Sequence, residues 1–387
     1  MDKGKSDRIL AVVSLAAVGI VCAMGMACRK EVQVPKPRNW TMELFLASKE
    51  RREAMLEHAR REGMVLFDGA SPFREGLACV RENNKYGFMD HSGNIVVPCQ
   101  LDSSAAFSGG YASVRMNGKS GFMDRQGNWI VETNYRQIGT LSENRAAFWS
   151  QEGRRGYLDR TGKVIIAPQY DAGFDFSEGL AVVHGGPGKR CKYVDEEGKI
   201  VIEGDYDLAT EFSGGLAIVR KADRSWFIDR MGIKAIPYEY KAVGEFAEGL
   251  ASVVIDGKSG FIDQSGKVVI PPVYGMVRKF SEGLAAVSKD KVWGYIDHSG
   301  ALVIPCRFQQ AGQFSEGIAA VKAEWKFGFI NRRGNPITAI QYDYAEGFSE
   351  GWAVVMIGNT FAFINRQGEY LKVKQGNEET RRESLAE

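Results

Sequence analysis

The hydrophobic and polar positions of this chain follow one pattern that recurs nine times. Each copy opens with an apolar residue, most often Phe, and then continues with small or acidic residues and a glycine, as in residues 280–283. The nine copies begin at Phe73, Phe107, Leu141, Phe176, Phe212, Phe246, Phe280, Phe314 and Phe348. Successive copies start 34 to 36 residues apart, and a fixed period of this size is typical of repeat architectures.

Each copy contains three short apolar segments separated by polar turns. In the copy that begins at Phe280, these segments are residues 284–287, 293–297 and 301–305. They are rich in β-branched and aromatic residues and bounded by Gly or Pro, which predicts strands. No window between them has helical spacing over enough residues for a helix. The pattern therefore predicts an all-β array of nine three-stranded units over residues 65–374.

The turn after the second strand is the most regular feature of the copy. An Asp or Asn stands three residues before a glycine in all nine copies, from Asp90 and Gly93 to Asn365 and Gly368. An Asx side chain bonds the backbone two residues on, and glycine supplies a positive φ, so this turn closes a hairpin. A row of calcium sites is the alternative. Calcium takes about six to eight oxygens and each turn offers one carboxylate, so we expect no metal site.

The recurring aromatics are expected to lie in the core between neighbouring units, because a lone hairpin is marginally stable and repeats need their neighbours. Two arrangements would achieve this. A copy of this length is short for a four-stranded propeller blade, and nine blades exceed the usual number. These points favour an open, curved solenoid. The alternative is a closed, propeller-like ring, which would bring residues 65–73 to residues 369–374.

These motifs resemble the WG-repeat family, also called KWG repeats, which is common in bacterial proteins. Its unit F-S-E-G-L-A-x-V, K-W-G-Y-I-D-x-x-G and V-I-P fits residues 280–287, 293–300 and 303–305. The Trp-Gly pair is intact only at Trp293-Gly294, and other copies keep the glycine alone or neither residue. The resemblance implies an all-β repeat without an agreed biochemical role. It brings no catalytic, metal-binding or cofactor-binding residues.

The N-terminus differs from the repeats. Three basic residues precede an uncharged run over residues 9–27, which predicts a signal peptide or membrane anchor within residues 1–28. Three outcomes stay open: cleavage after Ala27, lipidation of Cys28, or no cleavage and a single-pass anchor. Each outcome places the repeats outside the cytoplasm, at the cell envelope.

Three further segments flank the array. Residues 29–40 contain two prolines and predict an extended linker. Residues 41–63 mix apolar and charged positions and end in a glycine, which predicts a helix that caps the array or forms a stalk. Residues 375–387 are polar, and we expect this tail to be disordered.

Composition narrows the function classes. Lys and Arg number 50 and Asp and Glu number 48, for a net charge of +2, and no basic stripe is present, which argues against nucleic-acid binding. The four histidines share no spacing, and no nucleophile elbow, zinc pattern or carboxylate pair stands out. We therefore expect no enzyme and no cofactor. The six cysteines form no C-x-x-C pair, and those within the repeats are expected to be buried.

The remaining function is binding. A long repeat array offers an extended surface, so we expect a scaffold that binds a protein partner outside the cytoplasm and reaches the membrane through its N-terminal segment. The alternative is a glycan or cell-wall binding module. Trp325 and Trp352 lie off the shared Trp position and are the candidate ligand contacts, as platforms on which a sugar could stack.

Overall fold

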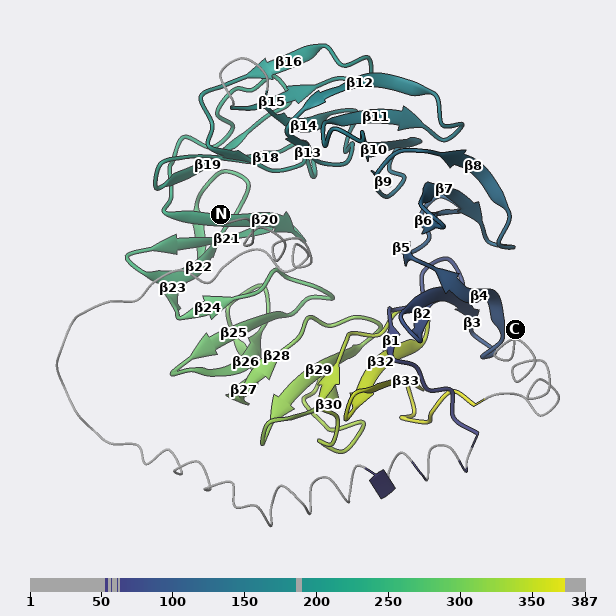
Figure 1. Cartoon of the computed structure of the whole chain (residues 1–387). Coiled ribbons are helices and arrows are strands. Elements are labelled where there is room, and N and C mark those ends of the chain that lie inside the picture. Colours follow the sequence, from purple (N-terminus) through teal and green to yellow (C-terminus); the bar gives the residue numbers. More distant parts are fainter. Residues whose placement is uncertain (1–52, 55–56, 58–60, 62, 186–189, 373–387) are drawn as a thin grey trace, which may run out of the picture. The chain divides into compact units, whose positions relative to one another are not determined.

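The computed structural model describes residues 53, 54, 57, 61, 63–185 and 190–372. Residues 63–185 and 190–372 form nine small antiparallel sheets arranged in a ring (Figure 1). We call the sheets blades 1 to 9 in chain order. The all-β prediction is confirmed. The preference for an open solenoid is wrong, because the ring closes: the fold is a nine-bladed β-propeller, the arrangement held as the alternative.

Six blades have four strands in chain order, and blades 5, 8 and 9 have three, with isolated bridges such as Phe327 with Tyr342 where the fourth strand would lie. In blade 1 the four strands are β1 (Gly69–Ala70), β2 (Leu77–Glu82), β3 (Lys85–Asp90) and β4 (Ile95–Leu101). The first strand lies nearest the centre of the ring and the fourth lies at its outer edge (Figure 1). The second and third strands pair from Leu77 with Asp90 to Glu82 with Lys85, which is the hairpin that the sequence predicts.

The other blades repeat this order. Blades 2 to 4 contain β5 (Ser103–Ser104), β6 (Tyr111–Met116), β7 (Lys119–Asp124), β8 (Trp129–Thr133), β9 (Gln137–Ile138), β10 (Arg145–Trp149), β11 (Arg155–Asp159), β12 (Val164–Tyr170), β13 (Ala172–Gly173), β14 (Ala181–His184), β15 (Cys191–Val194) and β16 (Ile200–Glu203). Blades 5 and 6 contain β17 (Leu208–Ala209), β18 (Ala217–Lys221), β19 (Arg224–Ile228), β20 (Ala242–Ala247), β21 (Leu250–Ile255), β22 (Lys258–Ile262) and β23 (Val268–Tyr274). Blades 7 to 9 contain β24 (Met276–Val277), β25 (Ala285–Lys289), β26 (Val292–Ile296), β27 (Leu302–Phe308), β28 (Gln310–Ala311), β29 (Ile318–Ala323), β30 (Lys326–Asn331), β31 (Tyr344–Ala345), β32 (Trp352–Ile357) and β33 (Thr360–Asn365).

The innermost strand explains how so short a copy makes a four-stranded blade. In most blades this strand has only two residues, as β1 does, so it adds little length to the three strands predicted from the sequence. Two residues are too few to show an alternating pattern, which is why these strands leave no signal in the sequence. Copy length is therefore no obstacle to a ring when the inner strands are this short.

The glycine of the Trp-Gly pair has a packing role. In blade 7 the fourth strand is irregular where it passes the third strand, and a Cβ on Gly294 would lie 2.4 Å from the carbonyl oxygen of Ile304. Gly87 in blade 1 faces Val97 in the same way. Only glycine fits a backbone approach this close, which explains why most copies keep the glycine and lose the tryptophan.

Neighbouring blades share their core through pairs of aromatic rings. Tyr295 of blade 7 packs on Phe314 of blade 8 with ring centroids 4.8 Å apart, and both side chains are buried. Equivalent pairs join Phe88 and Phe107, Tyr157 and Phe176, Tyr193 and Phe212, Phe227 and Phe246, Phe261 and Phe280, and Phe329 and Phe348. This arrangement confirms that the recurring aromatics are core residues.

The same contact closes the ring. Phe73 of blade 1 and Phe363 of blade 9 lie 5.1 Å apart, and both belong to one buried cluster with Val65, Phe67 and Leu371. Phe67 pairs with Phe361, which is the position that the fourth strand takes in other blades. Blade 9 is therefore completed by the segment that precedes blade 1.

The features outside the ring are partly described. Glu53, Ala54, Glu57 and Arg61 are helical, and the rest of the helix predicted over residues 41–63 lies outside the described residues, as do residues 1–40 and the tail 375–387. No helix in the described part of the chain is long and apolar enough to span a membrane. The cysteines of the repeats are buried or partly buried, and burial raises the pKa of the Cys79 thiol to about 12.

Candidate binding faces of the ring

The two faces of the ring carry different connections. One face, here the loop face, carries the loop between the first and second strands and the Asx turn between the third and fourth. In blade 1 these are residues 71–76 and 91–94. The opposite face, here the hairpin face, carries the tight turn between the second and third strands, residues 83–84 in blade 1. The hairpin face also carries the short connection from the fourth strand to the first strand of the next blade, such as Asp102 between β4 and β5.

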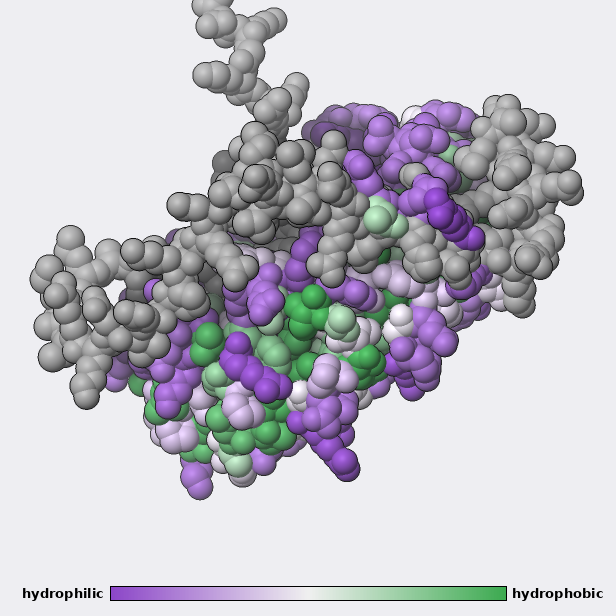
Figure 2. Space-filling view, turned by 90° about the horizontal axis from the view of Figure 1, so that it is seen from below, coloured by the Kyte–Doolittle hydropathy of each residue, from purple (hydrophilic) through white to green (hydrophobic). Residues whose placement is uncertain are grey.

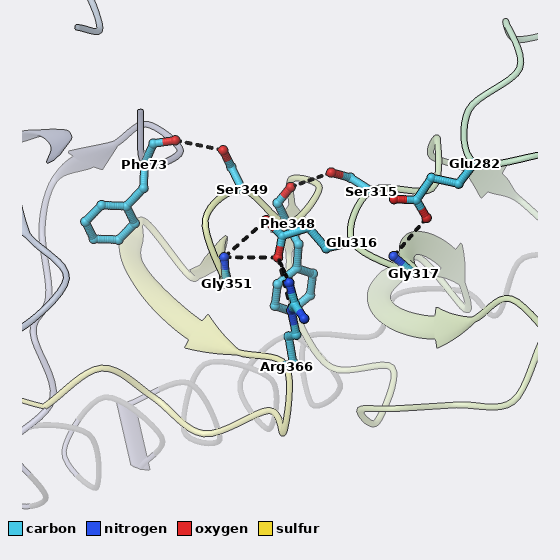
Figure 3. Close-up of polar contacts among 9 residues, drawn as sticks. All are labelled: Phe73, Glu282, Ser315, Glu316, Gly317, Phe348, Ser349, Gly351 and Arg366. Atoms are coloured by element: carbon cyan, nitrogen blue, oxygen red, sulfur yellow. Dashed lines mark hydrogen bonds and ion pairs between the residues drawn. The ribbon is translucent and has the colours of Figure 1, made fainter. Parts of the chain in front are cut away.

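On the loop face, serine hydroxyls link each loop to the next. Ser315 donates a hydrogen bond to the Phe348 carbonyl at 2.8 Å, and Ser349 donates to the Phe73 carbonyl at 2.7 Å, which crosses the closure of the ring (Figure 3). The same bond is made by Ser108, Ser142, Ser177 and Ser281. These serines follow the first Phe or Leu of their copies, so one sequence position supplies a repeated bond between blades.

The glutamate of the same loop makes a second link. Its carboxylate accepts a hydrogen bond from a backbone amide of the next loop, as Glu282 does from Gly317 at 2.8 Å and Glu316 does from Gly351 at 3.0 Å (Figure 3). Glu350 of blade 9 accepts from Gly76 of blade 1 at 2.9 Å. Seven glutamates act in this way: Glu75, Glu143, Glu178, Glu248, Glu282, Glu316 and Glu350.

We call the contact between two neighbouring blades a joint. At several joints a basic side chain from the Asx turn of one blade faces the glutamate carboxylate of the preceding blade. Arg366 pairs with Glu316 at 2.7 Å (Figure 3), His298 with Glu248 at 2.9 Å, and His91 with Glu350 at 3.1 Å. Each basic residue stands one position after the Asp or Asn of its turn. The loop face is therefore bound together by its own polar groups, and the carboxylates are engaged within the protein.

The joint between blades 3 and 4 carries a different ion pair. Glu196 replaces the basic residue in the turn of blade 4, and Arg145 replaces the usual apolar residue at the start of β10 in blade 3. The two side chains pair at 2.7 Å. The third copy, which departs most from the repeat pattern, thus keeps Glu143 and adds an arginine that meets the acidic residue of the next turn.

The repeated sequence segments that make these contacts match a known family. A family model described as WG containing repeat matches residues 66–86, 86–119, 121–148, 156–183, 193–224, 227–258, 260–293, 293–324 and 327–361. The chain belongs to the WG-repeat family. No curated protein matches it.

Solved structures resemble this WG-repeat ring at low sequence identity. A structure titled "Crystal structure of the eukaryotic initiation factor" has 10% identity and a TM-score of 0.56, with 76% of this chain and 93% of that chain covered. BamB from Moraxella catarrhalis has 14% identity and a TM-score of 0.41, with 79% of this chain and 96% of that chain covered. At an identity this low, the first likeness concerns the fold alone.

The hairpin face of the WG-repeat ring is less regular. The two longest copies gain their extra residues here, between β10 and β11 in blade 3 and between β14 and β15 in blade 4. The turns carry many charged side chains. Some turn amides donate a hydrogen bond to a side chain in the connection that leads into the same blade, as the Gly358 amide does to Asp343 at 2.8 Å. This face therefore differs from blade to blade in length and chemistry.

The two predicted contact residues lie on different faces. Trp325 is in the hairpin turn of blade 8 and is 69% exposed, with the Lys322 ammonium 5.8 Å from its ring centroid. Trp352 begins β32, next to the loop face, and packs against the core cluster at the ring closure. The structure does not bring the two side chains together, so they cannot form one binding platform.

The outer edge of the ring exposes apolar side chains as well. Val268 and Val269 on β23 and Leu302 and Val303 on β27 are 39% to 53% exposed, and Figure 2 shows hydrophobic side chains among hydrophilic ones on the edge viewed from below. Similar residues recur at the start of the fourth strand in other blades, such as Ile200 and Val201 on β16. We assign no site to them.

Sequence reasoning missed the loop-face network. A Ser and a Glu in a short loop resemble solvated turn residues, because nothing local shows that their partners lie one period away. Two signals point to them: the same pair recurs in most copies, and Arg145 and Glu196 depart from the pattern together. Among the described residues, no group of three His, Cys, Asp or Glu side chains is placed to hold a metal ion.

Proposed function

We propose that this WG-repeat protein is a non-enzymatic scaffold that binds a protein partner at the bacterial cell envelope, and that it does so with its hairpin face. The observation that carries the proposal is the contrast between the two faces. The loop face uses its polar groups in contacts between blades, whereas length changes collect at the hairpin tips. In repeat proteins, insertions that gather on one face often mark the binding face.

Trp325 is the residue we propose as the anchor for the partner. It stands at the tip of the blade 8 turn, where its side chain is 69% exposed. Exposed aromatic residues among charged neighbours are typical of binding hot spots. The Trp325 amide is fixed by a 2.8 Å hydrogen bond to the Gln309 side chain, so the backbone that presents the ring is held in place.

The location at the envelope rests on the N-terminal segment. Residues 1–28 have the charge and hydrophobicity pattern of an export signal or anchor. Retention through a lipidated Cys28 or through an uncleaved span would tether the ring to a membrane and leave its faces free. This part of the chain lies outside the described residues, and the location is a proposal from sequence.

A glycan is the second candidate ligand, and the same tryptophan favours it. A sugar ring would stack on Trp325. Glycan sites commonly use more than one aromatic platform, however, and Trp352 lies on the other face of the ring, which leaves the protein partner as the first candidate.

Site-specific photo-crosslinking of the full chain in its native cells tests the proposal. A crosslinker replaces Trp325, and a matched control replaces Gln367, an exposed residue of a loop-face turn. We expect one protein to be crosslinked from position 325 and not from position 367, and Trp325→Ala to weaken capture of that protein by a purified ring.

Three results would count against the proposal. Equal crosslinking from both positions would contradict a hairpin-face site. Loss of the crosslink in the presence of free cell-wall sugars would favour the glycan. Turnover of a substrate by the purified chain would overturn the non-enzymatic role.

A further inference from the structure

We propose that the joint between blades 2 and 3 is a binding site for a carboxylate supplied by a ligand. Seven joints of the loop face contain a glutamate carboxylate that bonds the next loop. In blade 2 the residue at this position is Gly109. The joint that follows therefore lacks the acceptor that most joints have, while the groups that would bind it remain.

The first of these groups is the backbone of the next loop. At the other joints the amide donor is the fourth residue of the copy, and at two of them the third residue donates as well. The equivalent residues in blade 3 are Glu143 and Asn144. Both have positive φ, at 50° and 62°, and successive amides in such a turn form a concave anion-binding nest. No carboxylate of the described residues accepts from these two amides.

The second group is a cation. Arg160 stands one residue after Asp159 in the Asx turn of blade 3, which is the position of His91, His298 and Arg366 in their blades. Those three side chains pair with the glutamate of the preceding blade. Arg160 has no such glutamate to meet, because the preceding blade carries Gly109.

The third observation is an open cavity of about 420 Å³ on the loop face of blade 3. Its lining includes Asn144, Arg145, Arg160 and Thr161, so residues that carry the amide and the guanidinium border the same space. Asp159 also borders it, but one of its carboxylate oxygens already accepts bonds from the Thr161 amide and hydroxyl and from the Lys163 amide. Arg145 is engaged by Glu196. The residues that carry the two donors, Asn144 and Arg160, therefore border one open space.

The joint between blades 5 and 6 provides a natural control. Its loop has Gly214 in place of the glutamate, so it also lacks the carboxylate, but the following turn carries Gln264 in place of a cation. The lost carboxylate is matched there by a lost positive charge. The joint between blades 2 and 3 keeps the positive charge of Arg160, as expected if a ligand supplies the carboxylate that pairs with it.

The carboxylate site is independent of the proposed function, because it lies on the loop face and uses no residue of the hairpin face. The ligand chemistry is a carboxylate that reaches the Asn144 amide and the Arg160 guanidinium. A glutamate side chain on another polypeptide and a small organic acid both supply it.

Binding to the full chain in detergent tests the site. The probes are a short uncharged peptide with one glutamate, labelled for fluorescence anisotropy, its glutamine counterpart, and glutarate as unlabelled competitor. The decisive variant is Gly109→Glu, which restores the residue found in seven other copies. Glutamates at this position have φ of 50° to 56° and Gly109 has 62°, and a Cβ there would meet only Leu141, at 3.9 Å. The built-in carboxylate then occupies the site.

We expect the glutamate peptide to bind at least tenfold more tightly than the glutamine peptide. Gly109→Glu and Arg160→Gln should each weaken it at least tenfold, and Gly214→Glu should leave it unchanged. Displacement by glutarate at equal concentration would assign the site to small acids, and displacement only at large excess would assign it to acidic polypeptides. Equal binding of the two peptides, or full binding by a folded Gly109→Glu variant, would overturn the proposal.

Discussion

Truncation of one phenylalanine at the ring closure should cost as much stability as the same truncation inside the ring. Phe73 is fully buried and packs on Phe363 of blade 9 at 5.1 Å. Phe314 is 1% exposed and packs on Tyr295 at 4.8 Å. The two residues occupy the same position of their copies, so Phe314→Ala is the matched control for Phe73→Ala.

The magnitude follows from burial. Replacing a buried phenylalanine by alanine removes its transfer free energy and leaves a cavity, for a total of about 3 to 5 kcal/mol. At the closure this cost arises only if blade 9 supplies the wall against which Phe73 packs. In an open array Phe73 would stand in a terminal unit with one side of its ring uncovered, and the cost would fall to about 1 kcal/mol or less.

Urea unfolding followed by tryptophan fluorescence measures both variants. The free energies of unfolding come from the midpoints and slopes. We expect losses for Phe73→Ala and Phe314→Ala that agree to within about 2 kcal/mol, which is the spread of one type of truncation between buried sites. A loss below about 1.5 kcal/mol for Phe73→Ala, with a full loss for Phe314→Ala, would refute the closed ring.

Three other changes test the repeated contacts. Tyr295→Phe removes the hydroxyl that donates to the Gly312 carbonyl of the next blade at 2.9 Å and should lower the free energy of unfolding by about 1 kcal/mol; a loss above about 3 kcal/mol in urea unfolding would mean that the phenol has another role. Gly294→Ala places a Cβ against the carbonyl of Ile304 and should cost about 1 to 3 kcal/mol, so an unchanged unfolding midpoint would contradict the close approach. Hydrogen bonds from the Ser299 hydroxyl and from the amides of its turn lower the pKa of Asp297. The ionised carboxylate therefore stabilises the fold above the unfolded pKa of about 3.9, and this stabilisation is lost as the pH falls through the lower folded value. The melting temperature of Asp297→Asn should therefore fall less than that of the wild type below about pH 4, and parallel acid titrations of the two proteins would contradict this.

Most of the blade could be predicted from the sequence, because its information is local. The hairpin between the second and third strands follows from alternation and from the Asx turn, whose Asp and Asn side chains bond the expected amides, as Asn331 does those of Arg333 and Asn335. The innermost strand could not be predicted, since two residues such as Met276 and Val277 carry no period.

The contacts between blades were harder to predict than the blades. Burial of the aromatics follows from the energetics of a small unit, but whether the last blade meets the first depends on a small rotation accumulated over nine joints. Phe67 offered a clue, because it matches the residue that ends the fourth strand in other copies and has no such strand before it. The position of each residue on the binding faces depends on the same geometry. Trp325 and Trp352 are 27 positions apart in sequence and both lie off the shared Trp position. Trp325 is at the tip of a hairpin turn, whereas Trp352 packs against the core.

A distance between blades 1 and 9 tests the central claim most directly. Spin labels at Asn84 and Asn359, which are exposed at the tips of hairpin turns in the two terminal blades, can be compared with labels at Asp290 and Glu324 in the adjacent blades 7 and 8. The closed ring predicts the same short distance for both pairs, measured by pulsed electron paramagnetic resonance. A short distance for the internal pair together with a much longer or undetectable distance for the terminal pair would contradict it.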